Sequence, residues 1–435
     1  MKRTLFTFIL AFGFLLGALT SSSEADDIWR SGSIYSQFGL GLPYGYQSSY
    51  SDAMGIHGTA VFDTRQPSIA NPATWSRSMM TNIGGVLEFS SQEATFDGIE
   101  TNSSNFQAGP LQLNIPIVRE RIGFNLSISP VTSARYVTES QELTVDGTGI
   151  ATEDNQLRYK VKNFGSGGIN RIEAGFGIRL TNEISIGYAP SLLLGVIRRN
   201  QDIGFNDPGH RIVNLNEKTS HYGFGHRFGL YMHRASAFRQ NDRIALGATF
   251  SLPVNFVSER ELISQIGASD ITVNPKSHYG DGDVTFPLEA SAGVSYNINP
   301  YFLMSADALY QNWDGYTNFD GDSEPFLKDR LKMGIGTQYI AARRDLDTFF
   351  SRFIYRLGLS YDNGSLKLDD GQNINTLSLH AGIGIPSSRT ASSININAEY
   401  GFRGIDDNNL VSERIFAIKV SFNLSELMFI QRRLQ

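Results

Sequence analysis

From Thr81 onward, the sequence repeats one pattern: segments of about ten residues in which apolar residues alternate with small or polar ones. A period of two is the spacing of a β-strand with one apolar face. Near the C-terminus, the segment 416–424 has an aromatic or aliphatic residue at every second position, with Lys419 and Ser421 between them. A charged side chain such as Lys419 must face water, so the second face of each strand lines either an outer surface or a wet lumen.

About 14 such segments can be counted, and bacterial single-chain barrels have an even number of strands. Their centres are Gly85, Leu113, Phe124, Tyr159 to Phe176 as one interrupted strand, Tyr188, Phe228, Leu246, Ala292, Ala306, Ile335, Leu357, Leu379, Ile396 and Ile418. Short connections alternate with long or acidic ones, which is typical of outer-membrane barrels and has no reason in a soluble sandwich. The sequence therefore predicts an all-β fold, a transmembrane antiparallel β-barrel of about 14 strands over 81–424, integral to the bacterial outer membrane.

Composition supports a barrel and excludes other classes of protein. Charged residues are 18% of the chain, below the roughly 25% of soluble domains, yet past the N-terminus no apolar run comes near the about 20 residues of a membrane-spanning helix. Cysteine is absent from the sequence, which excludes disulfide scaffolds, zinc ribbons, thiol nucleophiles and lipoprotein acylation. The net charge of −6 gives no electrostatic reason to bind nucleic acid.

Motifs for catalysis and metal binding are missing from the sequence. It has no Gly-x-Ser-x-Gly elbow, no His-Glu-x-x-His pair and no phosphate-binding Gly-Lys-Ser/Thr loop. His221, His226 and His233 are five and seven residues apart, which puts them on opposite faces of a strand in turn. The acidic residues within 314–324 lack the spacing of an EF-hand. We therefore expect no enzyme activity, no bound metal and no cofactor.

The first 25 residues have the features of a signal peptide. Lys2 and Arg3 precede an apolar stretch over 5–19, and small residues occupy the cleavage-determining positions Ser23 and Ala25. Cleavage after Ala25 would remove a net charge of +1 and change the net charge from −6 to −7. A retained anchor helix is the alternative, but the apolar stretch is shorter than a bilayer span.

Residues 26–80 precede the first clean strand and do not follow its pattern. They are rich in glycine, serine and tyrosine, and they hold more aromatic residues than a floppy tail would. Composition leaves three alternatives for this segment: a tail, a separate small domain, or a plug folded into the lumen. At the other end, residues 425–435 follow the last strand, and we expect them to form a periplasmic tail.

Several stretches of the chain carry a likeness to a known family. In the N-terminal segment they are 35–41 (YSQFGLG), 52–60 (DAMGIHGTA) and 71–73 (NPA), and in the barrel 165–170 (GSGGIN), 310–313 (YQNW), 355–359 (YRLGL) and 400–404 (YGFRG). In this order they resemble the long-chain fatty-acid and aromatic-hydrocarbon transporters of the outer membrane, the FadL/TodX group, in a form familiar from Bacteroidetes-like bacteria. The resemblance covers nearly the whole mature chain.

The resemblance implies that residues 26–80 form a hatch, or plug, inside a 14-stranded barrel. The hatch positions expected to contribute to ligand binding are Phe38, Gly39, Gly41, Gly55, Asn71, Pro72 and Ala73. It also implies passive uptake of hydrophobic molecules such as long-chain fatty acids, which would enter an apolar lumen pocket and leave sideways through a gap at a kinked third strand. The expected partners are these small molecules, outer-membrane lipids and, during biogenesis, the barrel assembly machinery, and the expected state is a monomer.

The sequence offers a candidate for the kink and lateral gate at Pro130, Val131, Thr132 and Ser133. The strand over 121–129 alternates regularly until it meets Pro130. Proline cannot donate a hydrogen bond to a neighbouring strand, so a mid-strand proline favours a bulge or bend. The alternative is that Pro130 marks the rim of the barrel.

Two connections, 201–220 and 257–282, are the longest expected external loops, and the resemblance implies that they form a landing groove. Within the second, residues 258–261 have capping-box spacing and begin a short amphipathic helix pattern. Its apolar residues, which would suit a greasy ligand, are Leu262, Ile263 and Ile266. The alternative is a helix that merely packs on its own loop.

Three other functions are alternatives to uptake. Relatives of the resembled family act as shuttles for secreted cargo, so a shuttle or scaffold for secreted or surface proteins is the main alternative. A membrane-embedded lipid hydrolase would need a serine, histidine and acid at the rim, and the sequence shows no such set. A wide aqueous porin is disfavoured if the N-terminal segment fills the lumen.

Overall fold

The computed structural model describes residues 32–44, 48–63, 66–146, 156–206, 212–266, 272–341, 349–367, 373–387, 390–404 and 411–426. The expected signal peptide, the first residues of the expected hatch and residues 427–435 lie outside this part. Within it, no helix is both long enough and apolar enough to cross a membrane.

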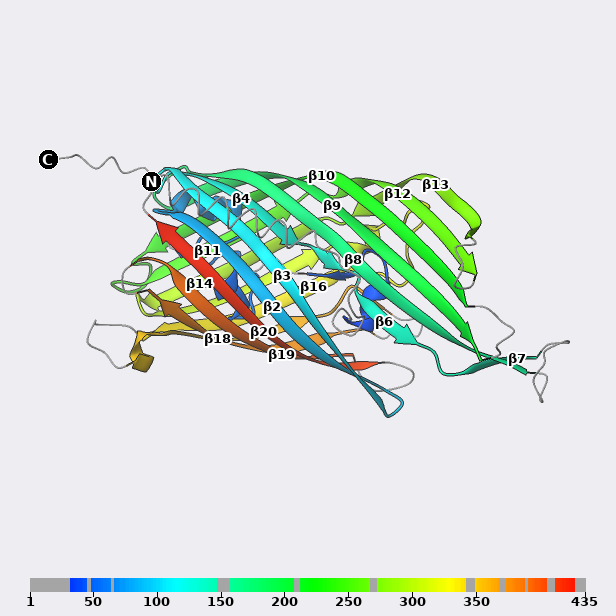
Figure 1. The fold of residues 1–435 in the computed structure, drawn as a ribbon. Helices are drawn as coiled ribbons and strands as arrows, with labels where there is room; N and C mark the ends of the chain where they lie inside the picture. The colour runs from blue at the N-terminus through cyan, green and yellow to red at the C-terminus, as the bar shows by residue number, and fades with distance from the viewer. Residues whose placement is uncertain are drawn as a thin grey trace, which may run out of the picture.

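One antiparallel sheet closes on itself to form a barrel (Figure 1). Its strands are β2 (Thr81–Phe96), β3 (Ile99–Val118), β4 (Ile122–Pro130), β6 (Tyr136–Glu139), β7 (Leu143–Asp146), β8 (Gln156–Arg179), β9 (Ile184–Phe205), β10 (Val213–Ala235), β11 (Arg243–Ser251), β12 (Val254–Ile266), β13 (Thr272–Phe286), β14 (Glu289–Asn299), β15 (Phe302–Gln311), β16 (Arg330–Ile340), β17 (Ile354–Asp362), β18 (Thr376–Pro386), β19 (Ser393–Arg403) and β20 (Ser412–Glu426). The barrel closes where β2 pairs with β20 over its whole length.

Three of the barrel's strands are each divided into shorter pieces. β4, β6 and β7 all pair with β8, β11 and β12 both pair with β10, and β13 and β14 continue opposite them. Three of these interruptions have a proline, at Pro130, Pro253 or Pro287, which cannot donate to the ladder, whereas the break between β6 and β7 has none. The described residues thus form 14 strands, which confirms the predicted fold class, and every predicted strand centre lies in a strand of its own.

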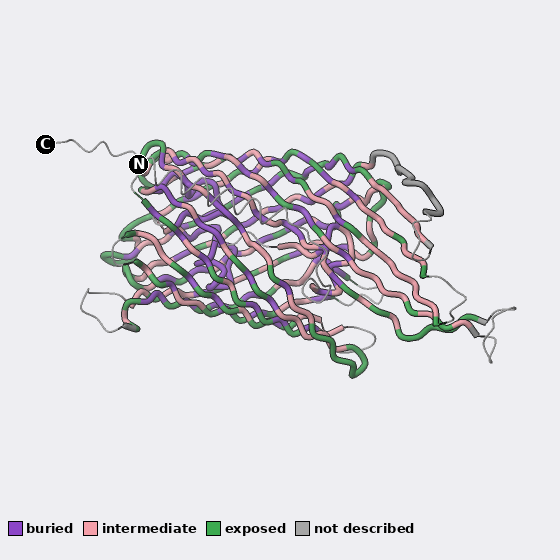
Figure 2. The backbone as a smooth tube through the Cα atoms, viewed as in Figure 1, coloured by how far each residue is buried: buried purple, intermediate pink, exposed green. Residues whose placement is uncertain are grey.

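The two faces of the barrel wall differ as the alternation predicts. On β17, Tyr355, Leu357, Leu359 and Tyr361 are exposed on the outside, whereas Arg356 and Ser360 between them are buried. Figure 2 shows the same alternation of buried and exposed residues along the other strands of the wall. An apolar outside surface suits the acyl chains of a membrane, and the polar inside surface is covered by the N-terminal segment.

The described part of residues 32–80 lies inside the barrel and is mostly buried (Figures 1 and 2). Its elements are short: η2 (Ile34–Gln37), β1 (Leu42–Pro43), α2 (Ser49–Asp52) and η3 (Pro72–Arg77). With so little regular structure, the segment depends on the wall for most of its hydrogen-bond partners. We refer to it as the hatch.

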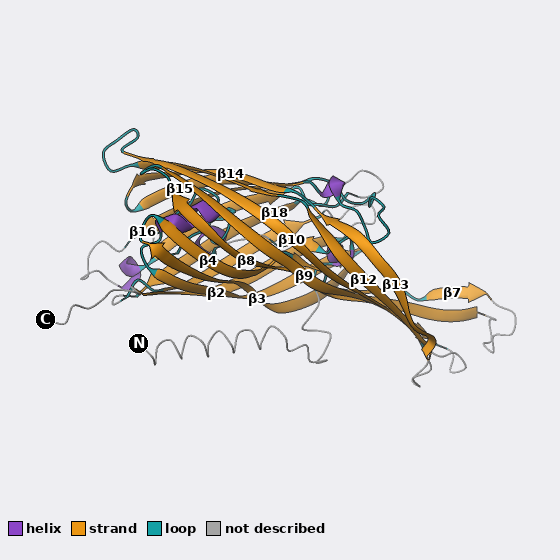
Figure 3. Cartoon of the chain, turned by 90° about the horizontal axis from the view of Figure 1, so that it is seen from above, coloured by secondary structure: helices purple, strands orange, loops and turns teal. Residues whose placement is uncertain are grey.

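Three neighbouring strands are much longer than a membrane requires. β8, β9 and β10 have 24, 22 and 23 residues, whereas about 9 to 11 tilted residues cross a bilayer. Figures 1 and 3 show that β8 and β9 project past most of the wall, at the end away from the start of β2. Because bacterial barrels place their long connections outside the cell, this end is the external one.

Two expectations about the external loops are corrected by these long strands. Most of 201–220 belongs to β9 and β10, which stay paired as far as Ile203 and Val213. The amphipathic helix expected over Leu262, Ile263 and Ile266 is wrong, because these residues lie in β12, between β10 and β13. The capping-box spacing is a local signal, and the hydrogen bonds that two long neighbouring strands provide outweigh it.

Candidate functional site

Asn71, at the start of the Asn71-Pro72-Ala73 motif, joins the hatch to the wall. Its Oδ1 accepts a hydrogen bond from the Ala73 N–H at 3.0 Å and so caps η3. Its Nδ2 donates to the carbonyl oxygen of Thr59 at 2.8 Å and to that of Leu230 on β10 at 3.0 Å. A single buried amide therefore connects two turns of the hatch with one strand of the barrel.

Glycines replace side chains where η3 meets the wall. Four of them form a row of direct cross-strand neighbours on β4, β8, β9 and β10: Gly123, Gly177, Gly187 and Gly229. A Cβ at any of them would lie within 2.6 Å of Asn71, Pro72 or Trp75. We call this row the glycine cradle. Sequence reasoning missed it, although the four glycines all fall on the lumen-facing parity of consecutive strands.

An aspartate on the opposite side of the wall binds another turn of the hatch. The carboxylate of Asp307 on β15 accepts from the backbone N–H groups of His57 at 2.9 Å, Gly58 at 2.6 Å and Thr59 at 3.3 Å. Burial lowers the pKa of His57 to about 4, so its imidazole is neutral at pH 7. The wall carboxylate of Asp307 therefore binds a hatch turn that carries no charge.

Two buried ion pairs also hold the hatch. Arg227 on β10 pairs with Glu173 on β8 and donates to the carbonyl oxygens of Ile69 at 2.8 Å and Ala70 at 2.7 Å. On the far side of the barrel, the Lys419 ammonium of β20 lies 2.7 Å from Asp52 of α2 and 3.1 Å from Glu399 of β19. Hatch and wall are thus joined by charge on two sides.

Asp52, Glu399 and His380 also bring three potential metal-ligand atoms within 4.8 Å of one another. The Lys419 ammonium contacts both carboxylates of this group, and His380 Nε2 bonds with the Ser360 hydroxyl at 2.9 Å. A divalent cation there would have to sit beside a fixed positive charge. The group is best explained as the ion pair that holds α2.

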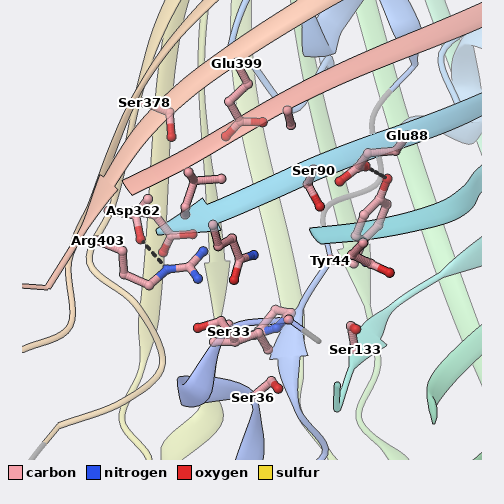
Figure 4. A pocket seen from close by; sticks show the side chains of 18 of the residues that line it. Ser33, Ser36, Tyr44, Glu88, Ser90, Ser133, Asp362, Ser378, Glu399 and Arg403 are labelled. Atoms are coloured by element: carbon pink, nitrogen blue, oxygen red, sulfur yellow. Dashed lines mark hydrogen bonds between the residues drawn. The ribbon is translucent and has the colours of Figure 1, made fainter. Parts of the chain in front are cut away.

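A chamber of about 190 Å³ lies between the hatch and the wall (Figure 4). The hatch contributes Ser33, Ser36 and Tyr44, and the Tyr44 hydroxyl donates to Glu88 of β2 at 2.6 Å. The wall contributes polar and charged side chains, which include Ser90, Gln92, Asn105, Gln107, Arg330, Lys332, Asp362, Thr376, Ser378, Glu399, Arg403 and Lys419. This chamber is polar, unlike the apolar pocket expected in the lumen.

The apolar side chains of the lumen are packed together instead. Leu40 of the hatch, Phe256 on β12, Phe286 on β13 and Trp313 after β15 are each at most 1% exposed and belong to one cluster. The rings of Phe256, Phe286 and Trp313 contact one another edge to face, with centroids 5.7 to 6.1 Å apart. Hatch and wall side chains thus fill this part of the lumen.

The wall is interrupted beside the chamber. After Pro130 the chain turns inward, and β5 (Thr132–Ser133) pairs with β1 of the hatch. β6 then returns to β8. Opposite the turn, Gly168 has a φ of 147°, and a Cβ there would lie 2.2 Å from the Thr132 carbonyl oxygen. Only glycine allows the strand to bend at this point.

The hatch positions predicted to bind ligand do not converge on one pocket. Gly41, with a φ of 91°, abuts the backbone of Ser133 at the bend, and the Phe38 ring lies 5.7 Å from that of Phe326. Gly55 lies against His380 on another side of the barrel. The motif 71–73 sits in the glycine cradle. As described, these positions are contacts between hatch and wall.

Comparisons with known proteins agree with this architecture. A family model described as BamG matches residues 6–435. The fold is similar to that of the CymD monoaromatic hydrocarbon channel (15% identity, covering 89% of this chain and 99% of that chain, TM-score 0.55). It is also similar to the toluene transporter TbuX of Ralstonia pickettii (16%, 89% and 99%, TM-score 0.56) and to a FadL homologue of Pseudomonas aeruginosa (12%, 88% and 99%, TM-score 0.59). No curated protein matches.

At these identities the likeness is one of fold. The predicted resemblance to the FadL/TodX group is confirmed at that level, and so is the placement of the protein as an integral outer-membrane barrel. Of these solved neighbours, CymD is named as a channel and TbuX as a transporter.

Proposed function

The chain belongs to the BamG family, and we propose that this outer-membrane barrel serves other envelope proteins as a scaffold or shuttle, with its lumen kept closed by the hatch. The family name fits an association with the barrel assembly machinery, which is the partner class that we propose. The strands that project on the external side, β8 to β10, offer sheet surface beyond the membrane for such a partner.

The observation that carries the proposal is the way in which the hatch is held. Arg227, Asp307 and Lys419, from three separate parts of the wall, each bind hatch groups in buried surroundings. Leaving one partner of a buried ion pair uncompensated costs about 3–5 kcal/mol. Opening the lumen would break the Lys419–Asp52 pair together with the hydrogen bonds that Arg227 and Asp307 make to the hatch backbone, so the structure favours a barrel that acts through its surface.

A deletion strain tests this proposal. We expect loss of the gene to lower the abundance of other outer-membrane and surface proteins, measured by quantitative proteomics of isolated outer membranes. Uptake of radiolabelled oleate by the same cells should be unchanged. The proposal fails if oleate uptake falls while the outer-membrane proteome stays the same.

Uptake of hydrophobic molecules is the second candidate, and two observations favour it. The chain shares its fold with hydrocarbon channels, and its wall is interrupted at Pro130, where lateral exit through a kinked strand would occur. In this case the ligand path would run beside Phe38 and Gly41 of the hatch to the bend at 130–133. The external landing site for such a ligand would be the sheet that carries Leu262 and Ile263.

Binding to purified protein tests the second candidate. Replacing Asn71, Pro72 and Ala73 by Gly-Gly-Gly should unseat η3 and abolish binding of a long-chain fatty acid, measured by calorimetry on the folded barrel. Replacing three residues of the exposed turn 236–238 by glycine is the matched control. Unaltered fatty-acid binding in the hatch variant would exclude the hatch from the ligand site.

A further inference from the structure

The interruption of the wall leaves two strand edges without a neighbour in the described part of the chain. β3 pairs with β4 only from Leu111 to Val118, and its remaining part, from Ile99 to Ala108, pairs only with β2. β6 pairs only with β8. Between β3 and β6 there is therefore a wedge in the wall without ladder hydrogen bonds. We call it the lateral wedge.

The polar chamber lies directly behind the lateral wedge. Its lining includes Asn105 and Gln107 on the β3 side and Ser133 and Arg135 on the β5 side. The Arg135 guanidinium donates to Asn105 Oδ1 at 2.7 Å and so bridges the two sides with a side chain, in place of backbone pairing. Figure 4 shows Ser90 and Ser133, from opposite sides of the interruption, near the same space.

On the outer surface, the lateral wedge is bordered by apolar side chains. Phe106 on β3 is 61% exposed, and Phe89, its cross-strand neighbour on β2, is also exposed. Val137 of β6 is exposed on the other side. These side chains suit contact with acyl chains. A molecule in the wedge would therefore meet an apolar surface outside and a polar chamber inside.

The charges of the chamber are balanced by carboxylates in its lining and directly beside it. Arg330 is 2.6 Å from Asp362, Lys419 is 3.1 Å from Glu399, and Arg403 is 3.0 Å from Glu413. The lining holds five cations and three carboxylates, and Glu413 and Asp52, which contact Arg403 and Lys419 from outside it, bring the carboxylates to five. Since these charges match in number, the chamber does not call for a charged ligand.

Hydroxyl and amide groups make up much of the rest of the lining. They belong to Ser33, Ser36, Ser90, Gln92, Asn105, Gln107, Ser133, Ser360, Thr376 and Ser378. Such groups both donate and accept hydrogen bonds, as do the hydroxyls of a saccharide. A hydrocarbon in this space would instead leave buried polar groups without partners, at a cost of about 1–3 kcal/mol each.

We propose that the chamber and the lateral wedge together bind an amphiphile, with an uncharged, hydroxyl-rich head in the chamber and an acyl chain against Phe106 and Val137. The site takes its ligand from the membrane and not from the aqueous lumen, which the hatch closes. This inference goes beyond the proposed scaffold function and does not depend on it.

The test uses the full mature barrel in amphipol and two probes with chains of similar length. Octyl glucoside, below its micellar concentration, carries the proposed kind of head, and nonanoate carries a carboxylate. We expect saturable calorimetric binding of octyl glucoside with a Kd at least tenfold lower than that of nonanoate. Free glucose at the same concentration should not bind.

Adjacent residues on opposite faces of β2 provide matched variants. Ser90→Phe fills the chamber and should weaken octyl glucoside binding at least tenfold. Ser91→Phe, on the outer face beside Phe416, should bind like the parent protein. Gln107→Leu removes a lining amide with little change in volume and should also weaken binding, which keeps the test valid if Ser90→Phe does not fold.

Three results would overturn the proposal: equal binding of nonanoate and octyl glucoside, undiminished binding in both folded chamber variants, or equal binding of free glucose. Folding of each variant is checked by the shift in gel mobility on heating. None of these outcomes bears on the proteome of the deletion strain, so this inference and the scaffold proposal fail separately.

Discussion

At the scale of single residues, the fit of the hatch in the lumen depends on wall positions that have no side chain as much as on the side chains that are present. In the glycine cradle, η3 approaches the wall so closely that a methyl group at Gly187 would lie 2.3 Å from the Pro72 carbonyl carbon. A row of glycines weakens strands, because glycine loses more entropy on folding than other residues. In this barrel the entropic cost of the glycine row falls where the hatch covers the wall.

Gly187→Val tests the cradle. The added side chain has no space, so we expect η3 to be displaced. The free energy of unfolding should fall by about 1–3 kcal/mol, which is typical of overpacking. Gly204→Val, on the same strand where a Cβ meets nothing within 4 Å, is the matched control. The thermal unfolding midpoint in detergent should fall for the first variant only. Equal midpoints would show that η3 is not seated there.

The Arg227–Glu173 pair gives a second prediction. Arg227→Met leaves Glu173 buried without its partner and should destabilise the barrel by about 3–5 kcal/mol, measured by urea unfolding. Adding Glu173→Leu should recover part of that loss, since an apolar pair needs no charge compensation but the carbonyl oxygens of Ile69 and Ala70 still lack their donor. Lys160→Met breaks an exposed pair with Glu139 and should change stability by less than about 1 kcal/mol. A double variant as unstable as the single one would contradict this explanation.

His57 gives the hatch a predictable dependence on pH. Its pKa is about 4 in the folded barrel because of burial, below the 6.5 of an exposed imidazole. The unfolded chain therefore binds the proton first, and stability should fall as the pH drops from about 6.5 to about 4. His57→Gln should flatten this part of the stability profile in urea titrations at several pH values. A slope that is the same in both proteins would place the titrating group elsewhere.

At the scale of elements, the sequence was informative wherever one face of a strand meets lipid. Alternation located every strand centre, because the membrane imposes a period of two that a single sequence records. Alternation did not locate the strand ends at 201–220 and 257–282. Those residues form strands because they pair with neighbouring strands, which a single sequence does not record. Nor could it show which wall residues contact Asn71 or Asp52, since these partners come from distant parts of the chain.

The same reasoning explains what the sequence showed of the interruptions. A proline in a strand is visible in the sequence, and Pro130, Pro253 and Pro287 each lie at a break between strand segments. The direction of the bend is not visible, because it depends on Gly168 across the ladder and on β1 in the hatch. The polarity of the chamber behind the bend also depends on side chains from several strands.

The pairing of β1 with β5 can be tested with cysteines, since the natural chain has none. Leu42 is directly opposite Ser133, at the Cα separation that suits a disulfide. The double variant Leu42→Cys/Ser133→Cys should form this bond on mild oxidation and leave the fold intact. Leu42→Cys/Val137→Cys, with the second cysteine on the outer face, should not. Absence of the first bond, by mass spectrometry of peptides, would rule out the inward bend.

At the scale of the whole molecule, the protein shares its fold with hydrocarbon channels, and its hatch fills part of the lumen. Solved neighbours with this architecture are hydrocarbon channels and transporters. Here the apolar part of the lumen is filled by side chains of hatch and wall, and the chamber beside the lateral wedge is polar. The fold supplies a rigid, lipid-embedded body, and the external strands and the membrane-facing side are where partners can reach it.

The most direct measurement is purification of the tagged protein, expressed at its native level, from its own outer membrane in mild detergent, followed by quantitative mass spectrometry of proteins and lipids. We predict that the barrel assembly machinery elutes with it in a fixed stoichiometric ratio, and that the Gly204→Val variant keeps that ratio. A barrel that elutes alone and carries bound long-chain fatty acid would contradict the account.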